Sequence, residues 1–311
     1  MSFFSGLLSA LPGAVAQGLI WGLMAIGVFI TFKVLDLADL TVDGTMATGG
    51  AVCIVMMTHG ANVWVAMLCA FLAGMLAGLI TGILHTCMGI PAILAGILTQ
   101  LALFSINLRI MDKKANVAIN PDNYKLLVSL RNVKKVTIEN PIFVAAVFTI
   151  VVIALLYWFF GTALGCSIRA TGANPNMSCA QGINVDFVKV LGLMLSNGLV
   201  ALASALYCQY QGFADVNMGR GAIVIGLAAV IIGEVLCDAF FRKGCNFSVR
   251  LGFVVLGGIV YYLVMVLILW LKLDPNDLKL FTAVIVAAFL AVPYLKGQAK
   301  SSFHRLKKGG K

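Results

Sequence analysis

The sequence predicts an all-α, polytopic membrane protein, and two observations support that fold class. Of its 311 residues, 61% are hydrophobic and only 11% are charged, whereas a soluble globular domain has about 25% charged residues. The apolar residues also form long runs, and a membrane-spanning helix needs about 20 of them. A chain of this composition cannot bury its apolar surface in one water-surrounded core. We expect a single transmembrane domain over residues 1–311 with about 8–10 spanning helices.

Nine apolar segments are candidates for these helices. The second and the seventh are short, rich in small residues and preceded by a polar, Gly-containing stretch. We therefore expect these two to be broken or re-entrant helices rather than full spans. The nine segments are residues 14–34, 44–58, 63–84, 91–110, 141–160, 188–212, 219–236, 250–271 and 279–295.

Three carboxylates, Asp36, Asp39 and Asp43, lie close together after the first segment. They fit a solvated loop between helices. They fit equally a structured turn deep in the protein, whose carboxylates cap helices or line a path. Asp43, Gly44 and Thr45 also make a good N-terminus for the next helix.

Polar and small residues on the third and fourth segments suggest helix packing. Gly74, Gly78 and Gly82 recur at a spacing that lets helices approach closely in lipid. On the fourth segment, Gln100 and Asn107 are amides at membrane depth. Such amides either form hydrogen bonds between helices or line a pathway.

Two polar stretches interrupt the apolar segments. Residues 111–140 form the longest insert, and its residues 126–130 and 136–138 have the composition of a small hairpin outside the membrane. Residues 165–187 form a shorter loop, in which Gly172, Asn174 and Pro175 stop and start helices. We expect one or two helical turns over 177–183, and contact of this loop with something outside the bilayer.

The chain also repeats a pattern of segments. Residues 38–44 align with residues 214–220, and in each case a long helix precedes and a short, small-residue helix follows. One additional helix, 141–160, separates the copies, so the half-repeats at about 14–110 and 188–295 should be inverted relative to each other. Inverted repeats with short, Gly-interrupted segments at matching positions are typical of transporters.

The basic tail, residues 296–311, sets the expected orientation. It contains six of the 22 Lys and Arg residues, and such a tail stays in the cytosol near anionic lipid. With nine spans, the N-terminus and the insert 111–140 are then extracytoplasmic and the loop 165–187 is cytosolic. Lys and Arg counts outside the tail do not favour this orientation.

Motifs for catalysis are missing from the sequence. It has no Gly-x4-Gly-Lys-Ser/Thr phosphate-binding loop, no HExxH and no GxSxG. The three histidines are far apart, and none of the eight cysteines forms a CxxC pair, so we expect no metal site and no disulfide framework. We expect no catalytic residue, and no nucleic-acid partner because no folded basic domain is present. Glu234 could pair with Arg242, line a pathway or, most simply, cap a loop.

The loop 165–187 and the repeat together resemble the permease subunits of ABC importers of the branched-chain amino acid/ribose type. Within that family the chain most resembles the tryptophan/tyrosine-type subgroup, over roughly residues 14–295. The acidic residue of the general importer signature is missing from this loop. The residues that carry the resemblance are Arg169-Ala170, Asn174, Ala180, Gly182-Ile183-Asn184, and the stretches 35–44 and 89–100.

The resemblance implies a multi-pass permease subunit in a bacterial plasma membrane that imports a small polar solute, most simply an aromatic or branched-chain amino acid. It implies a homodimer, two cytosolic ATPase subunits that bind ATP and Mg, and an extracytoplasmic substrate-binding protein. The loop 165–187 would be the coupling helix inserted into the ATPase, so replacing Gly182 or Arg169 should uncouple transport without unfolding the dimer. The coupling candidates are Arg169, Gly172, Asn174, Ala180, Gly182 and Asn184.

The substrate pathway is inferred from residue types rather than from the family. Helix N-termini near Gly44 and Gly219 could bind a solute carboxylate. A stand-alone secondary transporter or channel is the alternative function, and an intramembrane enzyme lacks the paired residues it needs. The pathway candidates are Asp43, Thr45, Thr48, Gln100, Asn107 and Asn197.

Overall fold

The structure is a computed structural model. It describes residues 3–120, 124, 126–133, 140–241, 246–270, 280, 283–284, 286–288 and 291. The elements in chain order are α1 (Phe3–Phe29), the π-helical turn η1 (Ile30–Val34), α2 (Thr41–Thr58), α3 (Val63–Thr86), α4 (Ala92–Ile110), β1 (Asn116–Ala118), η2 (Leu130–Asn132), α5 (Pro141–Gly161), α6 (Ala163–Ala173), α7 (Pro175–Ala180), α8 (Val185–Gln211), β2 (Phe213–Asp215), α9 (Ala222–Phe240) and α10 (Phe247–Trp270).

The all-α membrane fold is confirmed. Seven of the described helices are long and apolar enough to cross a membrane. The short α2 is not among them, and its residues from Thr41 to Met57 are mostly buried inside the bundle. The seventh predicted segment forms α9, which is long and apolar enough to span, so the expectation of a broken or re-entrant helix is not met there. The ninth predicted segment, 279–295, and the basic tail lie largely or wholly outside the described residues.

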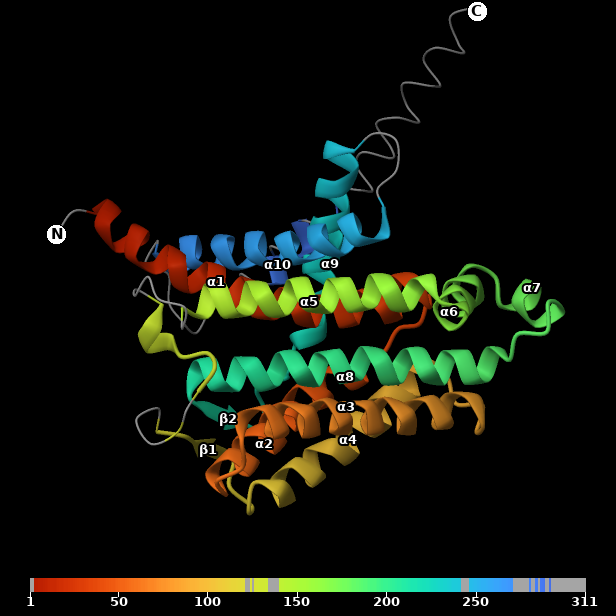
Figure 1. Cartoon of the computed structure of the whole chain (residues 1–311), viewed down its shortest axis with the longest axis horizontal. Helices are drawn as coiled ribbons and strands as arrows, with labels where there is room; N and C mark the ends of the chain where they lie inside the picture. Colours follow the sequence, from red (N-terminus) through yellow and green to blue (C-terminus); the bar gives the residue numbers. More distant parts are fainter. Residues whose placement is uncertain are drawn as a thin grey trace, which may run out of the picture.

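Two helix pairs organise the bundle, α1 with α10 and α3 with α8 (Figure 1). Both pairs touch backbone to backbone at glycines: Gly18 and Gly22 of α1 lie against α10, and Gly74 and Gly78 of α3 lie against α8. In the repeat, α1 corresponds to α8 and α3 to α10. Under the predicted correspondence, the two pairs are equivalent interfaces in the two half-repeats.

The small sheet corrects one prediction about the insert. Residues 126–130 do not form a hairpin strand; Leu130 begins η2 instead, and residues 136–138 lie outside the described part. The strand that forms in the insert is β1, and it pairs antiparallel with β2, which follows α8 (Asn116↔Asp215). The partner is distant in sequence because the ends of α4 and α8 meet at one end of the bundle.

The cysteines differ from expectation at one position. Cys237 is disulfide-bonded, whereas Cys53, Cys69, Cys87 and three others are free. Spacing alone does not predict such a bond, because pairing depends on which cysteines the fold brings together.

Candidate functional site

The turn between η1 and α2 lies deep in the protein at Asp39. Its Oδ1 accepts from the backbone N–H of Thr41 at 2.9 Å, and its Oδ2 accepts from Nδ2 of Asn197 at 2.7 Å. Oδ1 of Asn197 in turn accepts from the Thr45 hydroxyl at 2.7 Å. We call Asp39, Thr45 and Asn197 the closed cluster. Asp36, by contrast, is exposed and has a positive φ of 54°. Of the two interpretations of these carboxylates, the structured turn is therefore correct for Asp39 and the solvated loop for Asp36.

The threonines around this cluster are also satisfied within the protein. Thr41, Thr81 and Thr99 form a hydroxyl chain at 2.8 and 2.9 Å that links α2, α3 and α4. Thr48 donates to the Gly44 carbonyl of its own helix at 3.0 Å. Of the six pathway candidates, Thr45, Thr48 and Asn197 therefore have partners inside the protein.

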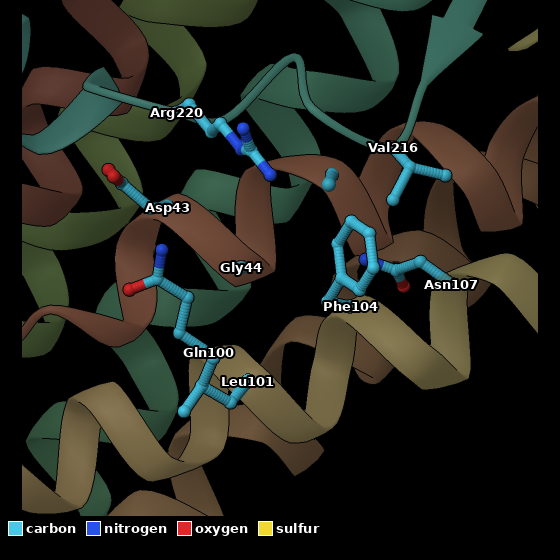
Figure 2. A pocket seen from close by; sticks show the side chains of 9 residues that line it. Asp43, Gly44, Gln100, Leu101, Phe104, Asn107, Val216 and Arg220 are labelled. Carbon is cyan, nitrogen blue, oxygen red and sulfur yellow. The ribbon is translucent and has the colours of Figure 1, made fainter. Parts of the chain in front are cut away.

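The other three candidates, Asp43, Gln100 and Asn107, meet in one cavity of about 270 Å³ (Figure 2). It lies between α2, α4 and the turn that joins β2 to α9. Gln100 is in the middle of α4, a candidate span, and Asn107 is in its last turn, so the cavity runs from membrane depth toward the end of this helix. The lining residues are Asp43, Gly44, Ala47, Gln100, Leu101, Phe104, Asn107, Val216 and Arg220.

Asp43 joins α2 to α9 at this cavity. Its Oδ2 accepts from the N–H of Gly221 at 3.0 Å and its Oδ1 from the N–H of Ile223 at 2.9 Å. The carboxylate of α2 thus caps the N-terminus of α9 and complements its dipole. This corrects the expectation that donors near Gly219 are open to a solute: helix α9 begins at Ala222, and Asp43 already occupies its first N–H groups.

Asn107 stands out in the cavity because its amide is unsatisfied. The residue is 0% exposed, and neither Oδ1 nor Nδ2 has a hydrogen-bond partner among the described residues. An unpaired buried polar group costs about 1–3 kcal/mol, so a residue of this kind calls for a functional explanation.

Arg220 is the cavity residue that sequence reasoning missed. Its guanidinium extends from the β2–α9 turn toward the space above Phe104 (Figure 2). The repeat contained a signal for it, because the alignment of 38–44 with 214–220 places Arg220 opposite Gly44, and both residues line the cavity.

At the other end of the molecule from β1 and β2, α6 and α7 project from the bundle (Figure 1). Three of the coupling candidates shape this segment. Asn174 accepts from the N–H of Met177 at 3.0 Å and caps α7, and Asn184 accepts from the N–H of Phe187 at 3.1 Å and caps α8. Gly182 has a φ of +81°, which a glycine adopts without strain.

The remaining coupling candidates divide between inner and outer faces. Gly172 packs directly on the Val34 carbonyl, and the Arg169 guanidinium lies 6.0 Å from the ring centroid of Phe247 on α10. Ala180 is exposed on α7. Sequence reasoning missed Met177, which is 59% exposed on the same short helix; an apolar residue within a polar loop was the available signal.

The inner side of this segment is basic. Lys33, Arg169 and Arg250 line a cavity of about 510 Å³ between η1, α6 and α10. Lys33 Nζ lies 3.1 Å from Oε2 of Glu234, so Glu234 pairs with Lys33; Arg242, the partner considered from sequence, lies outside the described residues.

Neither region is arranged as a metal centre within the described ranges, where no three His, Cys, Asp or Glu side chains are grouped to hold an ion. The membrane cavity offers opposite charges, amides and an aromatic wall, which is chemistry for binding.

Relatives in other organisms are transport permeases. The chain is 38% identical over 299 residues to a tyrosine transport system permease protein of Clostridioides difficile, and the match covers 96% of both chains. It is 28% identical to the D-allose transport system permease protein AlsC of Escherichia coli, over 76% of this chain and 70% of that one.

A solved structure supports the fold. PsaBC from Streptococcus pneumoniae in complex with Fab matches with a TM-score of 0.53 at 14% identity, covering 93% of this chain and 94% of that one. The family model for the branched-chain amino acid transport system / permease component matches residues 11–293. With its multi-pass helices and this match over nearly its whole length, the chain belongs to the branched-chain amino acid transport system permease family.

Proposed function

We propose that this chain is the transmembrane permease subunit of an ATP-dependent importer for a small polar solute, most simply an aromatic or branched-chain amino acid. ATP and Mg bind to separate cytosolic ATPase subunits, and an extracytoplasmic binding protein delivers the solute. This chain itself carries no cofactor and no catalytic site. The observation that supports the proposal is a continuous chain of contacts from the projecting α6–α7 segment to the cavity at membrane depth.

The chain of contacts begins at α6. Gly172 touches the Val34 carbonyl and Leu35 so closely that α6 cannot shift without moving η1. The Leu35 side chain packs on Gly192 of α8. From the following turn, Asp39 is hydrogen-bonded to Asn197 of α8.

The closed cluster continues this chain into the cavity. Asn197 is bonded to Thr45 of α2, and α2 carries Asp43, which holds α9 and lines the cavity. A push on α6 would thus reach both α2 and α9 through close-packed groups, which are bistable rather than continuously deformable.

Helix α7 supplies the surface on which an ATPase subunit would dock. Met177 is its apolar centre, and Asn176, Cys179 and Ala180 around it are exposed as well. An apolar side chain ringed by small and polar groups is the usual form of a binding anchor.

The cavity itself favours a second copy of this chain as its cover. It opens on the outer face of α4, where Leu101 is 65% and Phe104 is 40% exposed. Charged groups such as Asp43 and Arg220 do not face hydrocarbon at membrane depth. A homodimer that packs across α4 would enclose the cavity between its two copies.

The test is reconstitution in proteoliposomes with candidate ATPase and binding-protein partners, followed by uptake of radiolabelled L-tyrosine and L-leucine. We expect uptake only with ATP and with all components present. Concentrative uptake by this chain alone without ATP would establish the alternative, a secondary transporter. Equilibration without concentration would indicate a channel.

A further inference from the structure

We propose that the cavity binds the solute as a zwitterion, with Arg220 holding an α-carboxylate, Asp43 holding the α-ammonium and Asn107 hydrogen-bonding a polar group at the far end of the side chain. The ligand class is therefore an α-amino acid with a hydroxylated aromatic side chain. This inference rests on the proposed permease function and names the substrate class of that same site.

The charges of the cavity are the first support. Asp43 and Arg220 both line it, yet they form no ion pair with each other; in the part of the chain that the structure describes, the ion pair is that of Lys33 with Glu234. Arg220 is exposed at the rim of the cavity, and Asp43 is half-buried and held by two N–H groups of α9, so each charge can still take a partner from a bound solute. A zwitterion placed between them supplies one opposite charge to each.

Asp43 can take an ammonium group in addition to capping α9. Its two carboxylate oxygens each accept one backbone N–H, from Gly221 and Ile223. An ionised carboxylate offers about four lone-pair sites, so acceptor capacity remains toward the cavity. Gln100 lies on the same side as Asp43 (Figure 2) and can add a hydrogen bond there.

The far end of the cavity is the second, independent support. Asn107 is fully buried with both amide atoms unpaired among the described residues. Figure 2 places it beyond the Phe104 ring, on the opposite side from Asp43 and Gln100. Gln100 and Asn107 are seven residues apart on α4, which corresponds to about 10 Å at 1.5 Å per residue. That span suits an extended amino acid better than an inorganic ion.

The walls between these ends are apolar. Leu101, Phe104, Ala47 and Val216 line the cavity, and an aromatic ring would lie against Phe104 in an offset or edge arrangement. The volume of about 270 Å³ is below the roughly 300–1,000 Å³ of drug-sized pockets. A single amino acid matches this size and offers an opposite charge to each of Asp43 and Arg220, whereas a neutral sugar offers none.

The experiment measures tritiated L-tyrosine binding to the full-length chain in lipid nanodiscs, with unlabelled competitors. Tyramine lacks the carboxylate, 3-(4-hydroxyphenyl)propionate lacks the ammonium, and L-phenylalanine lacks the hydroxyl. We expect each to compete at least about tenfold more weakly than L-tyrosine, which corresponds to one lost interaction of about 1.4 kcal/mol. D-allose should not compete.

Variants assign each group to its residue. Arg220→Gln should weaken L-tyrosine binding at least about tenfold and abolish the preference for L-tyrosine over tyramine. Arg109→Gln, an equal charge change at an exposed position of the last turn of α4 outside the cavity, should leave both unchanged. Asn107→Leu should abolish the preference for L-tyrosine over L-phenylalanine, with size-exclusion elution and thermal unfolding as checks of folding.

Three results would overturn the inference: competition from D-allose, no measurable L-tyrosine binding to folded protein, or an Arg220→Gln variant that still prefers L-tyrosine over tyramine. If Asn107→Leu leaves the preference for L-tyrosine over L-phenylalanine unchanged, the Asn107 amide binds only water, and its assignment to the hydroxyl of the ligand is overturned. If the complete transporter still shows ATP-dependent uptake, any of these results contradicts the ligand assignment alone and the proposed permease function is retained.

Discussion

Two asparagines that are equally buried in the bundle have opposite surroundings. Asn197 and Asn107 are both 0% exposed and both lie on spanning helices. Asn197 is bonded to Asp39, Thr45 and the Leu193 carbonyl, whereas neither amide atom of Asn107 has a partner among the described residues. The sequence placed both in one pathway. The structure separates a polar group that holds helices together from one that faces a cavity.

The largest expected effect tests whether the two asparagines differ in their contribution to stability. Asn197→Leu should lower the free energy of unfolding by about 3 kcal/mol, because it removes several buried hydrogen bonds, one of them to the Asp39 carboxylate. Asn107→Leu is the matched variant and should leave stability unchanged or raise it. Thermal unfolding in detergent measures both, and equal destabilisation by the two substitutions would contradict the division into closed cluster and cavity.

The next effect compares the projecting α6–α7 segment with the insert at the opposite end of the molecule, in their contribution to ATPase association. Met177→Asp should weaken association with the ATPase subunit by about 2 kcal/mol, as loss of a central apolar anchor does. L-tyrosine binding to the permease alone should be unchanged. Leu130→Asp alters a residue of similar exposure, 57%, in the insert, and should leave ATPase association at the wild-type level when measured by co-purification.

A smaller effect sharpens the role of the turn between α7 and α8. Gly182→Ala places a side chain at a φ of +81° with nothing nearby to clash, so it should cost about 1 kcal/mol of local stability. Because that turn orients α7, we expect reduced uptake per ATP hydrolysed in the reconstituted transporter. Gly161→Ala also meets open space but has no positive φ, and it should leave the ratio of uptake to hydrolysis unchanged.

The smallest effect concerns the ion pair at the basic end. Lys33→Gln removes the contact with Glu234, and both side chains are partly exposed. Such pairs contribute about 0.2–1 kcal/mol and weaken with salt. Thermal unfolding at low and high ionic strength should show a small difference that disappears in high salt. A loss of stability as large as that of Asn197→Leu would contradict this expectation and show that the ion pair holds the fold together as strongly as the closed cluster does.

Local features of the chain were predictable from its sequence. Apolar runs of sufficient length gave the spanning helices, because hydrocarbon leaves helices as the simplest way to satisfy the backbone. Asn174 and Asn184 start helices where they stand, since each bonds to the N–H three residues further along the chain. Pro175 follows Asn174 as the first residue of α7. The broken character around residues 38–44 and 214–220 was visible for the same reason.

What the tertiary structure decided is which distant polar groups meet. Asp43 caps a helix 178 residues further along the chain, β1 pairs with a strand beyond α8, and Arg220 reaches the cavity only because α2 and the β2–α9 turn are packed together. The sequence by itself determined that the chain spans a membrane, where its helices run and that its halves repeat. Hydropathy and capping act over a few residues, so they could not say that Asn197 would be satisfied and Asn107 left free; that depended on how the two inverted halves pack.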